Sequence, residues 1–220
     1  MVVKSRRRLT LFMEQLNHTL NNVQREAYML KKTMHFILTG LLILLAVPTT
    51  ASVQEVHIEG VPFTRSVQAQ GSTLELKGYG LLRYMVFIKA YVGALYLPQT
   101  AGAGEVLGPV PKRLELQYFH PIKKADFARA TRIKIADNVA PAQAEQLRPR
   151  VDRLAALFED VQPGDRYSLT FIPGRGTELA LNGRVLGTIS GSDFARAIFA
   201  VWLGDNPIDT DFRDVLLGAG

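Results

Sequence analysis

Residues 78–98 read GYGLLRYMVFIKAYVGALYLP, and the fold of the chain depends on what this stretch forms. It is rich in Val, Ile, Phe and Tyr, and its only proline is its last residue, so we predict one long central β-strand. Side chains alternate between the two faces of a strand, and one face here is almost wholly apolar, which predicts that it lies against the core. That face holds Leu82, Tyr84, Val86, Ile88, Ala90, Val92 and Ala94.

The opposite face of the predicted strand sets charged and phenolic groups among large apolar side chains. It holds Arg83, Met85, Phe87, Lys89 and Tyr91. Burying an unpaired charge is costly, so we expect this face to meet water, a counter-ion or a ligand. A guanidinium binds both oxygens of a carboxylate at once, and a phenol on the same face could donate to the same anion. The alternative is an ordinary surface strand whose arginine pairs with a nearby acid.

The rest of the chain alternates between blocks of strands and blocks of helices. Strands are predicted from alternating and β-branched runs at 55–58, 73–77, 112–119, 167–172, 177–181 and 184–189. Helices are predicted from apolar residues at three- and four-residue spacing at 124–137, 142–160, 193–203 and 211–217. The dipeptide Asn182-Gly183 is a strong signal for a two-residue hairpin turn. The order lacks βαβ alternation, so we predict an α+β fold in which helices cover one face of an antiparallel sheet.

The positive charge of the chain is concentrated near its N-terminus. The formal net charge is +6, of which residues 1–51 carry +5 and residues 52–220 only +1. A basic protein invites a nucleic-acid partner, but a nearly neutral domain has no basic face to offer one. We therefore expect no nucleic-acid binding.

Residues 31–51 read KKTMHFILTGLLILLAVPTTA, which is the pattern of a secretory signal. Two lysines precede an apolar run of about a dozen residues, which is shorter than the roughly 20 that span a bilayer. We predict cleavage after Ala51 and a single periplasmic or secreted domain over 52–220, with membrane contact only through the signal. An uncleaved anchor is the alternative. Residues 1–30 fit neither part, so translation starting at Met29 or Met34, rather than at Met1 or Met13, is a further expectation.

Signals for familiar catalytic chemistry are missing from the sequence. His57 and His120 are isolated and no histidine pair has metal-ligand spacing, so we expect no metal site. The chain has no cysteine and no G-x-S-x-G motif, which removes the commonest nucleophiles. We expect no cofactor, and the mixed face of the predicted strand is the best candidate site.

Three tracts resemble the bacterial branch of the chalcone isomerase family. They are RYMVFIKAYVGALYLP at 83–98, FIPGRGTELALNGRVLGTISGSDFARAIFAVWLGDNPID at 171–209, and LLG at 216–218. The resemblance covers nearly all of 53–218 and implies an open-faced β-sandwich, in which a ligand cleft lies between a large antiparallel sheet and a layer of helices. The family contains plant isomerases and non-catalytic members, among them plastid fatty-acid-binding proteins.

The resemblance also implies which residues line the cleft. Isomerases, which close chalcone by adding a phenolate to an enone, use an arginine, two threonines, a tyrosine and an asparagine. The matching positions here are Arg83 for the arginine, Tyr91 and Val201 for the threonines, Phe127 for the tyrosine and Lys134 for the asparagine. An oxyanion would lose donors that are typically worth a few kcal/mol each, which argues against isomerase activity. The arginine and tyrosine instead resemble the carboxylate clamp of the fatty-acid-binding members.

The leading hypothesis is an exported, non-catalytic protein that binds a fatty acid or similar amphipathic carboxylate. The expected ligand-binding residues are Arg83 and Tyr91 at the head group, Met85, Phe87, Phe127 and Val201 along the tail, and Lys134. One alternative is an intramolecular lyase acting on a chalcone-like phenolic, with Arg83 as electrophile and Tyr91 as proton donor. Another is a structural or partner-binding protein of the cell envelope.

Overall fold

The computed structural model describes residues 24–32, 54–85 and 87–219. Residues 24–32 form an exposed helix, and Val53–Gly220 forms a compact unit that is described here by itself. Most of the predicted signal and its cleavage site at Ala51 lie outside the described residues. No helix among the described ranges is long and apolar enough to cross a bilayer.

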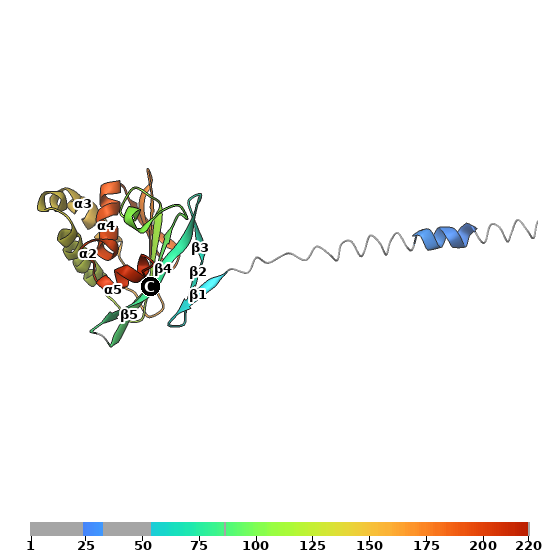
Figure 1. The fold of residues 1–220 in the computed structure, drawn as a ribbon, viewed down its shortest axis with the longest axis horizontal. Helices are drawn as coiled ribbons and strands as arrows, with labels where there is room; N and C mark the ends of the chain where they lie inside the picture. The colour runs from blue at the N-terminus through green and yellow to red at the C-terminus, as the bar shows by residue number, and fades with distance from the viewer. Residues whose placement is uncertain (1–23, 33–53, 86, 220) are drawn as a thin grey trace, which may run out of the picture. The chain divides into compact units, whose positions relative to one another are not determined.

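Seven antiparallel strands form the main sheet, and they follow one another in chain order (Figure 1). They are β3 Ser66–Ala69, β4 Ser72–Tyr84, β5 Ile88–Leu97, β6 Lys112–Tyr118, β7 Arg166–Ile172, β8 Gly176–Leu181 and β9 Arg184–Ile189. Two further strands, β1 Glu55–Ile58 and β2 Val61–Thr64, pair with each other in a separate sheet. The large antiparallel sheet confirms the predicted α+β class.

The prediction of a single long strand over 78–98 is wrong, because the chain turns back on itself in the middle of this stretch. β4 ends at Tyr84 and β5 begins at Ile88, and the two strands pair antiparallel in the sheet. Met85 takes a left-handed φ of 49°, and the N–H of Phe87 donates to the carbonyl of Met85 over 2.7 Å. A run of strand-forming residues without glycine or asparagine gave no sign of this turn.

Four helices cover one face of the sheet (Figure 1). They are α2 Lys124–Asn138, α3 Pro141–Leu157, α4 Ser192–Leu203 and α5 Thr210–Leu216. The most apolar is α4, whose buried residues include Phe194, Ile198 and Phe199. The short helix α5 lies so close to β4 that a Cβ atom on Gly78 would sit 2.2 Å from the carbonyl oxygen of Val215, so this contact requires glycine.

The other face of the sheet is covered near β4 and β5 by the β1–β2 hairpin. From Tyr91 onward β5 is therefore buried on both faces, which accounts for its nearly continuous apolar sequence. Tyr91, Leu95 and Leu97 belong to the core beneath the helices, whereas Val92, Ala94 and Tyr96 belong to the core beneath β1 and β2.

A charge network around the buried Glu115 joins the β1–β2 hairpin to the sheet. Glu115 on β6 accepts from the Nε of Arg113 over 2.8 Å and from the Nη1 of Arg166 over 3.0 Å. Arg166 also donates to the carbonyl of Pro62 over 2.9 Å and lies over the ring of Phe63. Each charge is paired and hydrogen-bonded, as buried charges must be. The hairpin is thus tied to this face of the sheet at β6 and β7, and an apolar cavity lies on the helical side.

Candidate functional site

An apolar cavity of about 280 Å³ lies between the sheet and the helical layer. Strands β5 to β8 supply its floor, where Tyr91, Leu116 and Leu179 are lining residues. Helix α2 supplies Phe127 and helix α4 supplies Val201, so three separate parts of the chain meet around the space. The cavity is enclosed mainly by apolar side chains, as most small-molecule sites are.

Aromatic rings in mutual contact form one wall of the cavity. The ring of Phe127 lies 5.3 Å from the rings of Tyr118 and Tyr167, edge to face in both cases, and stacks on Phe158 at 5.5 Å. Tyr118 in turn meets Tyr91 edge to face at 5.4 Å. Contacts of this geometry add to the stability gained from burial, so the cluster gives the cavity a well-defined wall.

Two buried phenols place hydroxyl groups at this apolar space. The Tyr91 hydroxyl accepts from Nε1 of Trp202 over 3.1 Å, which leaves its own proton without an acceptor among the described residues. The Tyr118 hydroxyl likewise has no hydrogen-bond partner within the described part of the chain, although Tyr118 lines the cavity. Burial raises the pKa of both phenols well above the ordinary value, so both are O–H donors near neutral pH. Among the described residues, the fully buried side-chain oxygens without a partner are those of Tyr96 and Thr177, so the Tyr118 hydroxyl is open to the cavity, where water or a ligand oxygen can accept from it.

Two cations of α2 stand at the edge of the cavity. Arg129 pairs with Asp126 over 2.6 Å. Lys134 is held less firmly, with Nζ 3.4 Å from Asp137 and 3.5 Å from the carbonyl oxygen of Pro207. Its side chain is only 28% exposed. Lys134 is therefore the rim cation better placed to take an anionic group from a ligand.

A short segment after α4 connects Lys134 to the helix that carries Trp202. Pro207 contacts Lys134, and the next residue, Ile208, donates from its N–H to the carbonyl of Val201 over 2.8 Å. Val201 precedes Trp202, which donates to Tyr91. Lys134 and Tyr91 therefore both line the cavity, but the pKa of the Tyr91 phenol is raised by burial and by the carboxylate of Asp209, which is the charged group that acts on it.

Four of the seven predicted ligand-binding residues line this cavity. They are Tyr91, Phe127, Lys134 and Val201. The prediction that Arg83 shares a face with Tyr91 is wrong, because the turn at Met85 and an irregular register after Leu82 separate them. Tyr91 is buried beneath the helices, whereas Arg83 is near the hairpin turn, with its side chain 45% exposed and 3.6 Å from Glu59.

The other two predicted residues also lie away from the cavity. Met85 and Phe87 are at the β4–β5 turn, where they are 70% and 87% exposed. Trp202 and Tyr118 are two of the lining residues that were not predicted to belong to a site. Trp202 lies in an apolar helical stripe that is typical of a core, and Tyr118 ends an alternating strand. Only the indole N–H of Trp202 and the hydroxyl of Tyr118 distinguish these residues in the sequence from ordinary core residues.

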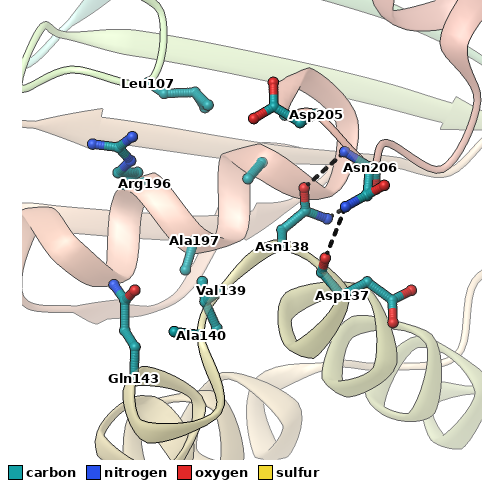
Figure 2. Close-up of a pocket in the computed structure, with 12 residues that line it drawn as sticks. Leu107, Asp137, Asn138, Val139, Ala140, Gln143, Arg196, Ala197, Asp205 and Asn206 are labelled. Atoms are coloured by element: carbon teal, nitrogen blue, oxygen red, sulfur yellow. Dashed lines mark hydrogen bonds between the residues drawn. The ribbon is translucent and has the colours of Figure 1, made fainter.

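A second, larger hollow of about 400 Å³ lies between the α2–α3 connection and the end of α4. Figure 2 shows that the side-chain amides of Asn138 and Asn206 bond to backbone groups of the facing segment. Asn138 donates from Nδ2 to the carbonyl of Asn206 over 2.8 Å and accepts from the N–H of Asn206 over 3.2 Å. Asn206 donates from its own side chain to the carbonyl of Asp137 over 3.1 Å. These groups are committed to joining the helices, so the apolar cavity is the better candidate.

Metal chemistry has no support in the described ranges. No group of three or more His, Asp or Glu side chains there is placed to hold a metal ion. The arrangement offers instead an apolar space, two phenolic donors and a cation at its rim, which together suit an amphipathic anion.

Comparison with known proteins finds one matching family and a similar solved structure. A family model described as chalcone isomerase-like matches residues 55–218. The chain is also similar to the crystal structure of a fatty-acid binding protein of Arabidopsis thaliana, with a TM-score of 0.58 and 16% sequence identity over 74% of this chain and 96% of that one. At this identity the likeness concerns the fold alone. No curated protein matches the chain.

Proposed function

The chain belongs to the chalcone isomerase-like family, and we propose that it is a non-catalytic member that binds a fatty acid or similar amphipathic carboxylate in the apolar cavity. The observation that carries the proposal is the pair of buried phenols, Tyr91 and Tyr118, whose O–H groups meet an apolar space without an acceptor among the described residues. A solved protein of similar fold is named a fatty-acid binding protein, which is consistent with this choice of ligand.

The apolar tail of the ligand would supply most of the affinity. Burial of apolar surface is worth about 25 cal/mol per Å². The cavity volume of about 280 Å³ is just below the roughly 300–1,000 Å³ of typical ligand pockets. A twelve-carbon fatty acid and a two-ring phenolic have similar volumes, so the choice between them rests on the polar groups of the lining and not on size.

The carboxylate would bind between Lys134 and Tyr91, both of which line the cavity. The ammonium supplies the opposite charge, and the phenol supplies a neutral donor that Trp202 holds in place. Hydrogen bonds to a charged group are about twice as strong as those between neutral groups. Arg83, which sequence patterning placed in this role, is exposed elsewhere and takes no part.

The residues of the cavity support isomerase activity less well than they support ligand binding. The residues in the positions of the family's hydrogen-bonding set include Phe127 and Val201, which cannot stabilise an oxyanion. The arginine expected to act as electrophile is the exposed Arg83.

We expect Tyr91→Phe and Lys134→Met each to weaken binding of dodecanoate about tenfold, because each removes one charge-assisted hydrogen bond worth about 1.4 kcal/mol or more. Isothermal titration of the delipidated chain measures this directly. Arg129→Met is the matched control, since Arg129 is a rim cation already paired with Asp126. Unchanged affinity in both test variants, or no bound lipid in the mass spectrum of the purified chain, would rule out the proposal.

We also propose that the domain is exported, as its leader pattern indicates. N-terminal sequencing of the protein recovered from a bacterial periplasmic fraction should begin immediately after Ala51. A chain with a positively charged residue inserted in the apolar run 36–47 should stay in the cytoplasm uncleaved. Recovery of wild-type protein with its leader intact would instead support the uncleaved anchor.

A further inference from the structure

The turn between β4 and β5 carries a cluster of exposed apolar side chains. Phe87 is 87% exposed, more than any other large hydrophobic residue in the described ranges, and Met85, Tyr84 and Ile88 beside it are 70%, 59% and 43% exposed. Single exposed apolar residues are ordinary, but four at one turn form a patch that needs an explanation. None of these four residues lines the apolar cavity.

This cluster stands on a projecting support. Figure 1 shows the β4–β5 hairpin extending beyond the body of the unit. Its strands stay paired up to the turn, with Arg83 opposite Lys89 and Tyr84 opposite Ile88. The apolar residues therefore occupy the tip of a paired ribbon, where no described neighbour covers them.

Two cations lie directly behind the apolar tip. The side chains of Arg83 and Lys89 are 45% and 47% exposed, and they share a single carboxylate, Glu59. The base of the tip is therefore net positive. This arrangement matches the layers of a bilayer. The apolar side chains at the tip would meet the acyl chains, the aromatic ring would lie at the interface, and the cations behind it would meet anionic headgroups. A tip two strands wide cannot supply the roughly 800 Å² per partner that a stable protein interface needs, whereas a bilayer accepts a small wedge.

We propose that the β4–β5 hairpin docks the protein on anionic lipid bilayers. Met85 and Phe87 enter the boundary between headgroups and acyl chains, Tyr84 lies at headgroup level, and Arg83 and Lys89 meet lipid phosphates. This contact is additional to the one expected from the leader. Ile88 is three residues from Tyr91, or about 10 Å along β5, so docking places the cavity near the membrane, where amphipathic carboxylates partition. The two proposals can fail separately, because hairpin docking needs no ligand in the cavity.

The test places a fluorescent probe at the tip of the full chain. Phe87→Trp is mixed with vesicles of brominated phosphatidylcholine and phosphatidylglycerol in equal parts, and emission is compared with that of the parent, whose only tryptophan is Trp202. We expect the added tryptophan to shift to the blue and to lose at least half of its emission, since bromine quenches only at short range. The matched control is Val185→Trp, at an exposed apolar position on β9, which should stay unquenched.

The leader contains an apolar run that could itself bind vesicles, so vesicle binding alone does not test the proposal. The test is the difference in quenching between tryptophan at position 87 and tryptophan at position 185. Equal quenching at positions 87 and 185, or no quenching at 87, would overturn the proposal. Adding Arg83→Ser and Lys89→Ser to Phe87→Trp should reduce the quenching several-fold on anionic vesicles. Equally strong quenching on pure phosphatidylcholine would overturn the anionic specificity.

Discussion

Replacing Val201 by phenylalanine should weaken binding of dodecanoate by roughly 60-fold. Val201 is a buried residue of α4 that lines the apolar cavity, and a ring at this position would occupy space that the proposed tail requires. Displacing about 100 Å² of tail surface costs about 2.5 kcal/mol at 25 cal/mol per Å². Titration of the delipidated variant measures the loss, and a thermal unfolding curve checks that the fold survives the added volume.

The matched variant Val201→Ala separates blocking of the cavity from disturbance of α4. It changes the same position but enlarges the space, so dodecanoate affinity should change by no more than a few-fold. A folded Val201→Phe protein that binds as tightly as the wild type would show that the tail lies elsewhere. Equal losses in both variants would point to α4 itself rather than to the filled cavity.

Much of the fold could be predicted because its signals are local. The turn at Asn182-Gly183 between β8 and β9 is an example, since both residues take positive φ values of 51° and 80° and both belong to types that tolerate them. The turn at Met85 uses the same region of backbone space with a residue that gives no such signal. At Met85 the pairing of β4 with β5 outweighs the preference of the residue against a left-handed backbone conformation. The sequence therefore does not reveal this turn.

The candidate site was less predictable, because a cavity is space that several elements leave unfilled. Phe127, Lys134 and Val201 were expected from resemblance to a family, and nothing in their spacing marks them. The predicted partnership of Arg83 with Tyr91 failed because strand periodicity does not continue through a turn. Tyr118 and Trp202 were missed because a buried aromatic residue that lines a cavity has the same sequence pattern as one that fills a core.

A buried lysine on the helical side of the sheet makes stability depend on pH. Lys112, at the start of β6, has no exposed surface, and its Nζ donates to the carbonyl of Gly108 over 2.7 Å. It lies 4.7 Å from the ring centre of Phe171 and 5.4 Å from that of Phe199 on α4, with no carboxylate paired to it among the described residues. Burial lowers the pKa of Lys112 to about 8 from an ordinary 10.5.

The sign of the effect follows from where the proton resides. Between about pH 8 and 10.5 the unfolded lysine keeps a proton that the folded one has released, so unfolding takes up a proton and stability rises with pH. A difference of this size between the two pKa values is worth roughly 3 kcal/mol in total. The buried tyrosines have raised pKa values and act in the opposite direction above pH 10, so the useful window is pH 8 to 10.

Comparison of the wild type with Lys112→Met isolates this contribution, because the tyrosines are common to both. Urea unfolding from pH 7 to 10 should show the wild type gaining about 2–3 kcal/mol relative to the variant, nearly all of it above pH 8. The exposed Lys77→Met serves as control and should follow the wild type at every pH. Parallel curves for wild type and Lys112→Met would mean that water or a mobile loop relieves the buried charge.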